Sequence, residues 1–560
     1  MLYKIKNNFV GNGNKSINWV VENFKFITFF QKKLFYCFKI QIYNKMAIKI
    51  LWVDDEIELL KSHFIFLEKK GYATTKINNA TDAIELLKEE NFSALLLDEN
   101  MPGMSGLEAI QKIKEIRPNL PIIMVTKNEE EHIMEEAIGS HIADYLIKPV
   151  NPNQILLSLK KILEGSKLIT EKAVVDYQMA FRNIAMEIMN AHDFEDWENV
   201  YKKLVHWEIM LENIDDTQML EILNQQKEDA NRQFCKYIEK NYHGWLHGED
   251  RPTLSHTLIK EYVRPYLQDD KKTLLLVIDN LRHDQWKMIQ PLFQQYYNHL
   301  EEKMYYSILP SSTQYARNAL FAGLLPLEIE KRFPNEWKND NEEGNKNDFE
   351  PKFLTDNLGR LGLKNLRTKY YKILNSAFEK KVLDEFSKFK NNDLTVIVYN
   401  FIDILSHAKT DNSVVSEMIR DDKTYRAITK NWFKHSYLLE IIKLAAQEDM
   451  RLIITTDHGT IFVKEPTQVV GDKETSVNLR YKLGRHLQYN ESDVFAVERP
   501  EDYYLPKVNV TSKYIFATND TFLAFPKNYN HFVNYYKNTY QHGGISMEEM
   551  IIPFVVLENR

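Results

Sequence analysis

Residues 94–106 read ALLLDENMPGMSG, an apolar run that ends in an acidic residue and is followed by a turn containing Pro and Gly. A short apolar run bounded by turn residues is typical of a buried strand. Similar runs stand at residues 49–53, 122–125 and 144–147, with helix-like segments between them. This alternation predicts an α/β domain with a doubly wound parallel sheet over residues 46–165.

Polar side chains suited to phosphoryl chemistry stand where these strands end. They are Asp54, Asp55, Asp98, Thr126 and Lys148. Ligands bind at the carboxyl ends of the strands in an open parallel sheet, so we expect these side chains to converge. Three carboxylates in one crevice repel one another, and a hard cation such as Mg²⁺ relieves that repulsion. The sequence therefore predicts a Mg²⁺ site at Asp54, Asp55 and Asp98, with Asp98 as the phosphoryl acceptor.

The motifs at residues 97–106 (LDENMPGMSG) and 145–149 (YLIKP) resemble those of bacterial receiver domains, which have a flavodoxin-like fold. The resemblance implies a sensor histidine kinase as partner and a homodimer that forms on phosphorylation. The Thr126 hydroxyl and the Lys148 ammonium can bind the added phosphoryl oxygens, and Tyr145 can then follow Thr126. A receiver that has lost this chemistry and serves only as a docking surface is the alternative.

The composition of the chain is that of a folded protein with several domains. Its 560 residues, 44% of them hydrophobic, exceed what one hydrophobic core usually organises. A net charge of -7 gives no general attraction to nucleic acid or anionic lipid, so an anionic substrate must be held locally. Cys37 and Cys235 lack metal-binding spacing and suit a reducing compartment, so we expect a cytoplasmic protein.

Residues 1–45 differ from the rest in being rich in Lys, Asn and Phe. Their apolar stretches, 26–30 and 34–38, are separated by Gln and Lys, so they predict neither a membrane span nor a signal peptide. We expect an extension upstream of Met46 that arises from a misplaced start codon. Contact of a basic segment with a membrane surface is the alternative.

Residues 166–265 have the pattern of a helical bundle that links two domains. No proline occurs between Asn153 and Arg251, and Phe181, Ile184 and Ile188 recur at helical spacing. This pattern predicts a linker with an apolar core and no cofactor of its own.

Residues 266–560 predict a second, larger α/β domain. Strand-like runs return at 273–278, 394–399, 452–456 and 551–557. Potential metal ligands stand near the ends of these runs. Asp279, Asp403, His407, Asp457 and His458 follow a run, and His542 precedes the last one. Three carboxylates and three imidazoles suit Zn²⁺ or Mn²⁺ better than Mg²⁺ alone, and they suffice for two ions.

Thr313 is the candidate nucleophile of this domain, in the stretch LPSSTQYAR at residues 309–317. A free hydroxyl is a weak nucleophile, but coordination to a metal ion activates it at neutral pH while a second cation stabilises the transition state. We therefore expect Thr313 to lie beside the ligand cluster.

The DxxxH pair, the DHG triplet, the last His and the PSxT motif resemble, in this order, the alkaline phosphatase superfamily and its PglZ-type domains. The resemblance implies one Zn²⁺ on Asp279, Thr313, Asp457 and His458. It implies a second Zn²⁺ on the remaining ligands, which are Asp403, His407 and His542.

Substrate contacts transfer less directly from this resemblance. Position 316 is Ala, where nucleotide phosphodiesterases of the superfamily usually have Asn. Arg317 is either a phosphate contact or a surface ion pair. Arg480 and Arg485 either guide a phosphodiester or form a solvated basic face. The charge-dense segment 334–351 is expected to be a solvated loop.

A receiver, a helical bundle and a PglZ-type domain in one chain resemble response regulators associated with type IX protein secretion. The resemblance implies contacts with secretion-motor components, a link to a sigma factor and phosphodiesterase activity on oligonucleotides. No direct DNA-binding module is expected, because the C-terminal half lacks a helix-turn-helix and a basic stripe. The sequence thus predicts a phosphodiesterase controlled by Asp98. The alternatives are a metal-stabilised docking module, and a phosphomonoesterase or phosphotransferase.

Overall fold

The computed structural model describes residues 48–127, 142–212, 217–411 and 418–559. The predicted N-terminal extension therefore lies outside the described residues. The chain forms two compact units, residues 1–172 and 173–560. No helix within the described ranges combines the length and the hydropathy that a membrane span requires.

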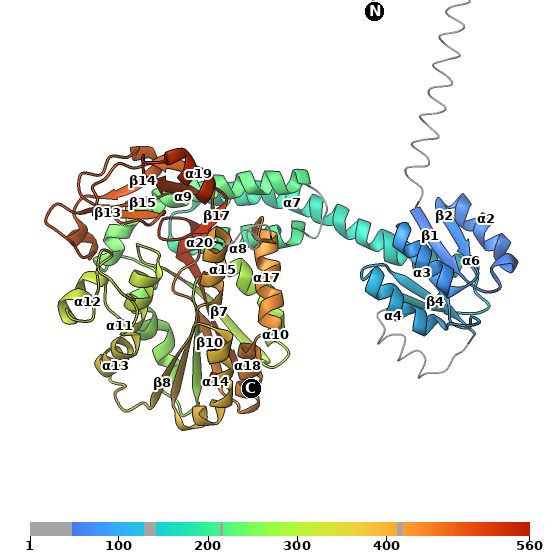
Figure 1. The fold of residues 1–560 in the computed structure, drawn as a ribbon, viewed down its shortest axis with the longest axis horizontal. Coiled ribbons are helices and arrows are strands. Elements are labelled where there is room, and N and C mark those ends of the chain that lie inside the picture. The colour runs from blue at the N-terminus through green and yellow to red at the C-terminus, as the bar shows by residue number, and fades with distance from the viewer. Residues whose placement is uncertain (1–47, 128–141, 213–216, 412–417, 560) are drawn as a thin grey trace, which may run out of the picture. The chain divides into compact units, whose positions relative to one another are not determined.

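The first unit holds a five-stranded sheet in which every pairing is parallel (Figure 1). The strands, in the order β2-β1-β3-β4-β5, are β1 (Ile48–Val53), β2 (Tyr72–Ile77), β3 (Ala94–Asp98), β4 (Ile122–Thr126) and β5 (Asp144–Ile147). Helices α2 (Lys61–Lys69), α3 (Ala80–Glu89), α4 (Gly106–Ile116) and α6 (Pro152–Leu159) accompany the sheet.

 The two faces of the sheet carry separate apolar cores, one against α3 and α4 and the other against α2 and α6 (Pro152–Leu159), as in a doubly wound fold.

The predicted fold class is confirmed, although β2 was not among the predicted strands. Its sequence, YATTKI, is partly exposed and is not an apolar run, because β2 forms the edge of the sheet. Helix α4 begins directly after the Asp98 loop, where the Ser105 hydroxyl accepts the N–H of Glu108 at 3.2 Å. This capping box fixes the start of the helix next to the predicted phosphorylation site.

The predicted helical linker consists of three helices, α7 (Gly165–Asn190), α8 (Phe194–Glu212) and α9 (Thr217–Leu246). Trp197 on α8 packs edge-to-face against Phe234 on α9, with ring centroids 5.5 Å apart. Phe234 in turn stacks on Tyr306, which belongs to the large sheet of the second unit. Helices α8 and α9 therefore share one hydrophobic core with the output domain.

The output domain is built on a six-stranded mixed sheet with the strand order β7-β18-β10-β6-β9-β8 (Figure 1). The strands are β6 (Thr273–Ile278), β7 (His299–Tyr306), β8 (Thr368–Ile373), β9 (Leu394–Tyr399), β10 (Arg451–Thr455) and β18 (Ile551–Glu558). Strands β10, β6, β9 and β8 run parallel, so their carboxyl ends lie along one edge. Strand β18 pairs antiparallel with both β10 and β7.

Helices cover both faces of this sheet. One core contains α10 (His283–Phe293), α14 (Ser376–Asp384), α17 (Asp422–Lys434) and α18 (Tyr437–Gln447). The other core contains the linker helices, α11 (Asn318–Ala322), α12 (Pro326–Arg332) and α13 (Glu350–Arg360). The parallel strands β6, β9 and β10 are fully buried between these layers, which explains why their sequences are largely continuous apolar runs.

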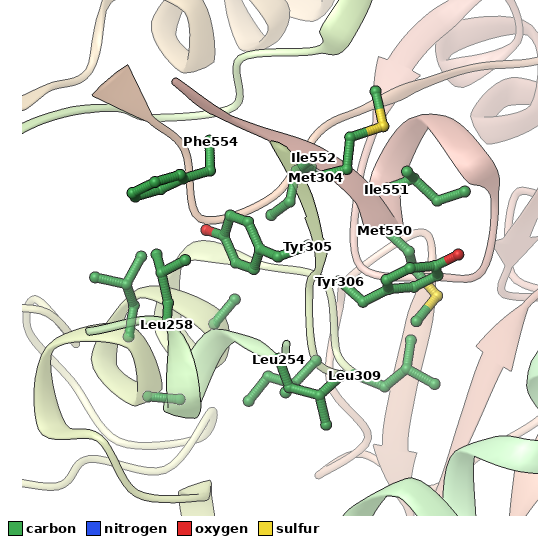
Figure 2. Close-up of a cluster of buried hydrophobic side chains, with 14 of the residues drawn as sticks. Leu254, Leu258, Met304, Tyr305, Tyr306, Leu309, Met550, Ile551, Ile552 and Phe554 are labelled. Carbon is green, nitrogen blue, oxygen red and sulfur yellow. The ribbon is translucent and has the colours of Figure 1, made fainter. Parts of the chain in front are cut away.

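Strands β7 and β18 anchor the end of β10, where the output site forms. Figure 2 shows Tyr305 and Tyr306 of β7 among Leu254, Leu258 and side chains of β18. The Tyr305 hydroxyl donates to the carbonyl of Thr456, and the hydroxyl of Ser307 donates to the carbonyl of Asp457 at 2.8 Å. These bonds hold the turn after β10 against the end of β7, across the intervening strand β18.

Small C-terminal sheets complete the domain. They join β11 (Ile461–Val463) with β17 (Thr539–Gln541), β12 (Glu465–Gln468) with β16 (Thr521–Ala524), and β13 (Tyr481–Gly484) with β15 (Lys513–Ala517) and β14 (Val494–Val497). Because β17 pairs with β11, which follows the DHG triplet, His542 is brought to the end of β10. The chain then enters α20 (Met547–Met550) and β18.

Candidate phosphorylation site and candidate metal centre

The receiver carboxylates converge at the end of the parallel sheet, as the strand ends predicted. Asp54 and Asp98 are buried, Asp55 is exposed, and one oxygen of each lies within 4.8 Å of the others. The Lys148 ammonium lies 2.9 Å from Asp54 Oδ2 and 2.9 Å from Asp98 Oδ1. Burial raises the pKa of Asp98, and the negative charges of Asp54 and Asp55 act in the same direction, while Lys148 opposes them. This arrangement can hold a divalent cation beside an acidic phosphoryl acceptor.

The expected switch residues lie on the two strands beyond β3. Thr126 ends β4 and is buried, and its carbonyl accepts the N–H of Lys148 at 2.7 Å. Tyr145 lies on β5, in register with Met124 of β4. Thr126 therefore ends the strand next to β3, and Lys148 contacts Asp98 directly.

Thr313 lies at the first ligand group of the output domain, which comprises Asp279, Asp457 and His458. Its Oγ1 is 3.0 Å from His458 Nε2 and 3.3 Å from Asp279 Oδ1. His458 Nε2 lies 3.6 Å from Asp279 Oδ1 and 3.8 Å from Asp457 Oδ2. The three ligands are fully buried, whereas Thr313 is partly exposed, so the hydroxyl is the accessible member of this group.

Asp403, His407 and His542 form the second group. Asp403 Oδ1 lies 3.4 Å from His407 Nε2 and 3.6 Å from His542 Nε2. Asp403 and His407 share one face of α15 (Phe401–Asp411), at the spacing of one helical turn. The rings of His542 and His458 are stacked with centroids 4.3 Å apart, so the two groups are adjacent.

The donor atoms of both groups are of the kinds that zinc binds, and those of each group lie within 4.8 Å of one another. Ligand atoms on a tetrahedral zinc ion with bonds of about 2.0 Å lie about 3.3 Å apart, close to the separations found here. Among the described residues, the buried Asp457 Oδ2 has no hydrogen-bond partner. Burial raises the pKa of Asp279 well above its usual value, and the charges of Asp457 and Asp403 add to this effect although Arg317 opposes it. A bound cation would relieve this crowding of carboxylates.

Two asparagines that were not predicted as site residues orient the carboxylate ligands. The Asn400 side chain donates to Asp279 Oδ2 at 3.0 Å. Asn280 donates from its side chain to Asp403 Oδ1 and from its backbone to Asp457 Oδ1, each at 3.4 Å. Asn280 has a positive φ of 66°, a conformation that Asn tolerates better than most residues. An Asn one or two residues after a buried strand was the available sequence signal for both.

Arg317 is neither a surface ion pair nor a group exposed to substrate. It is buried, donates to Asp279, and its Nε lies 2.6 Å from Glu350 Oε1. Its partner Glu350 belongs to the segment 334–351, and Asn347 of the same segment donates to the carbonyl of Thr313 at 3.0 Å. The expectation of a merely solvated loop is therefore wrong for this part of the segment, which supports the candidate nucleophile.

The predicted contact of Arg480 with substrate is also wrong. Its guanidinium is fully buried and lies 2.7 Å from Glu549 Oε2, because the chain just before β13 packs against α20. Arg485 lies in partly exposed ion pairs with Asp472 and Glu474. These pairs agree with the alternative reading of Arg485 as part of a solvated face.

Three protein-family models match the chain. The response regulator receiver domain matches residues 50–160, the PorX response regulator linker domain residues 167–246, and the BREX system PglZ alkaline phosphatase-like domain residues 258–557. A receiver domain implies phosphorylation by a sensor kinase.

Curated relatives match the receiver region. The transcriptional regulatory protein SrrA of Staphylococcus aureus is 33% identical over 125 residues, which are 22% of this chain and 52% of the relative. The chain thus spans about half the length of the curated relatives it matches.

Solved receiver structures give matches of the same extent. A CheY-like receiver domain protein from Methanospirillum hungatei JF-1 is 30% identical, with a TM-score of 0.21, and covers 21% of this chain and 95% of that one. Chemotaxis protein CheY4 of Vibrio cholerae is 26% identical, with a TM-score of 0.20, and covers 21% of this chain and 99% of that one.

The PglZ match alone extends over more than half of the chain. The chain therefore belongs to the PglZ alkaline phosphatase-like family, within the group of PorX-like response regulators in which a receiver and a PorX-type linker precede the PglZ domain.

Proposed function

We propose that the output domain hydrolyses phosphodiesters and that phosphorylation of Asp98 controls this activity. The observation that carries the proposal is the position of Thr313, whose hydroxyl contacts Asp279 and His458 while a second ligand group lies next to His458. A partly exposed hydroxyl on one of two adjacent ligand groups is an arrangement that suits in-line attack on a phosphorus atom.

The proposal gives each part of the site a role. Asp279, Asp457, His458 and Thr313 would hold one zinc ion, and Asp403, His407 and His542 the other. Bound zinc would supply positive charge that lowers the pKa of the attacking hydroxyl and offsets the charge of the phosphate. Thr313 attacks phosphorus from its partly exposed position. Asn347 holds its backbone, so that Oγ1 keeps its direction.

The charges around Thr313 favour an anionic substrate. Three ligand carboxylates against two divalent ions leave about one positive charge. The structure adds Arg317 and Glu350, which pair with each other and cancel. Burial lowers the pKa of His542 well below its usual value, with the nearby His458 adding to the effect, so its imidazole is neutral and able to act as a ligand.

The receiver supplies control in this proposal. Mg²⁺ at Asp54, Asp55 and Asp98 would support phosphoryl transfer from a sensor histidine kinase, and a phosphorylation-dependent homodimer would follow. The match to the PorX linker domain supports a role of the chain in regulating type IX protein secretion from the cytoplasm. Secretion-motor components and a sigma factor are the proposed partners, and oligonucleotides the proposed substrates.

The test uses the purified full-length chain with two equivalents of Zn²⁺. Turnover of bis-p-nitrophenyl phosphate and of p-nitrophenyl phosphate is measured with and without acetyl phosphate as phosphoryl donor. A zinc-dependent diester rate that exceeds the monoester rate and responds to acetyl phosphate is expected. A faster monoester rate would instead indicate a phosphomonoesterase. Stoichiometric zinc with no turnover of either ester would indicate a docking module.

A further inference from the structure

Two ligand turns of the output site, residues 457–459 and 542–544, are attached to the short helix α20. The N–H of Gly459 donates to the carbonyl of Glu549 at 3.0 Å. The carboxylate of Glu549 accepts the N–H of Gly544 at 2.9 Å. The position of α20 therefore influences where His458 and His542 lie.

The attachment of the first turn is close. A Cβ atom at Gly459 would lie 2.0 Å from the carbonyl oxygen of Glu548, far inside van der Waals contact. The backbone of α20 and the turn after His458 are thus packed directly on each other, with no space for one to move without the other.

Linker helix α9 binds α20 from the opposite side. The side-chain amide of Asn231 donates to Glu548 Oε2 at 2.9 Å, and its oxygen accepts the N–H of Met547 at 2.8 Å. Asn231 is 5% exposed, so these bonds are shielded from water. Four residues earlier on the same face, the Lys227 ammonium lies 3.9 Å from Glu548 Oε1.

Lys227 also connects α9 to the turn after Asp279. Its ammonium lies 2.6 Å from Glu208 Oε2 and 4.0 Å from Asp422 Oδ2. Asp422 lies 2.7 Å from Arg282, three residues after Asp279. One ammonium of the linker, on a side chain that is 12% exposed, thereby lies near two carboxylates, Glu548 and Asp422, that contact separate ligand segments.

Removing that cation would take the nearby ammonium from Glu548 and leave Glu208 and Asp422 with Arg426 and Arg282 as their remaining ion-pair partners. A carboxylate that loses a cation in this way moves toward water or takes up a proton, and either change shifts the backbone that carries it. Side chains that support metal ligands in this way change the affinity of the site without touching the metal.

We propose that Lys227 and Asn231 of linker helix α9 are positioning residues for the output site, acting through α20 on the turns that carry His458 and His542. The inference rests on the proposed function in taking these histidines as metal ligands. It makes the linker a structural part of the site, so that a displacement of α9 against the output sheet would alter the ligand geometry.

The test compares Lys227→Met with Lys464→Met in the full-length chain. Lys464 is the matched control, because it joins α9 to the output domain through Glu228 at 2.8 Å without touching α20. Hydrogen–deuterium exchange is measured on the metal-free proteins. Lys227→Met is expected to speed exchange about tenfold in peptides covering 456–460 and 541–549. Peptides from β6 are expected to be unchanged in both variants.

A second readout uses Co²⁺, whose visible absorption reports ligand geometry. Lys227→Met is expected to weaken Co²⁺ binding about tenfold and to change the spectrum, while Lys227→Arg restores both and Lys464→Met changes neither. Asn231→Ala, which leaves no buried charge unpaired, serves if Lys227→Met does not fold. An unmodified chain that binds no Co²⁺ would remove the proposed metal site, and the exchange measurement would still decide the positioning role. Uniformly faster exchange, or equal effects of Lys227→Met and Lys464→Met, would overturn the inference.

Discussion

The hydroxyl of Thr313 lies 3.0 Å from Nε2 of His458, although 145 residues separate them in the chain. Thr313 begins a short helical turn a few residues after β7, whereas His458 follows β10. In the sheet, β18 lies between β7 and β10. The contact places a potential nucleophile on a potential metal ligand and gives the first prediction.

Thr313→Ala is expected to lower kcat for diester hydrolysis on the order of a thousandfold, because it removes the attacking oxygen while the buried ligands remain. Zinc content, measured by elemental analysis, should fall by less than one equivalent. Ser312→Ala is the control, since it removes the adjacent hydroxyl from the same turn. Equal activity of Thr313→Ala and the unmodified chain would exclude Thr313 as nucleophile.

Removal of metal is expected to destabilise the second unit. A zinc ion that binds the folded site and not the unfolded chain adds about 3 kcal/mol to the free energy of unfolding at an excess of about 100-fold over Kd. Thermal unfolding with and without a chelator measures the change. His407→Ala, which removes a half-exposed ligand, should reduce the zinc-dependent part of the shift. An identical melting temperature in both conditions would contradict the metal centre.

Gly459→Ala is expected to destabilise the protein by about 2 kcal/mol or more, because the added methyl group overlaps the Glu548 carbonyl. The matched control is Gly359→Ala near the end of α13, where a Cβ meets nothing within 4 Å. There the same change should stabilise by about 0.5 kcal/mol through helix propensity. Urea unfolding gives both values. A Gly459→Ala variant as stable as the unmodified chain would show that α20 moves easily to make room for the methyl group.

The stability of the second unit is expected to fall between pH 7 and pH 5, partly because of His283. Burial lowers the pKa of His283 to about 4, below the value of the unfolded chain. The unfolded chain therefore takes up a proton first as the pH falls, which favours unfolding. The contribution of His283 to the free energy of unfolding is present above the pKa that it has in the unfolded chain, and it falls by about 2 kcal/mol between pH 7 and pH 5.

His283→Gln should reduce that pH dependence, whereas the exposed His531→Gln should leave it unchanged. Free energies of unfolding from urea titrations at the two pH values provide the measurement. An equal change in the free energy of unfolding between the two pH values in the unmodified chain and in both variants would show that His283 is not responsible.

Asp98→Asn is expected to abolish phosphorylation of the chain by acetyl phosphate, because an amide cannot form the acyl phosphate. Intact-protein mass spectrometry detects the added phosphoryl group. Glu85→Gln, on the outer face of α3, is the control and should be modified like the unmodified chain. A phosphoryl group on Asp98→Asn would place the acceptor elsewhere.

Much of the fold could be predicted because buried parallel strands are continuous apolar runs. The strand that ends at Asp98 and the strands that end one or two residues before Asp279 and Asp457 were recognised in this way. Edge strands β2 and β8 were not, since one of their faces is partly exposed and their sequences carry Thr, Lys and Tyr.

The sequence by itself determined which side chains stand at strand ends, because strand length and side-chain chemistry are local properties. Only the tertiary structure decided what those side chains face. Arg480 and Arg317 have the sequence character of substrate contacts, yet long-range packing buries both against carboxylates. Likewise, Asn231 has no distinguishing pattern in α9, and its bonds to α20 arise because residues more than 300 positions apart pack into one core.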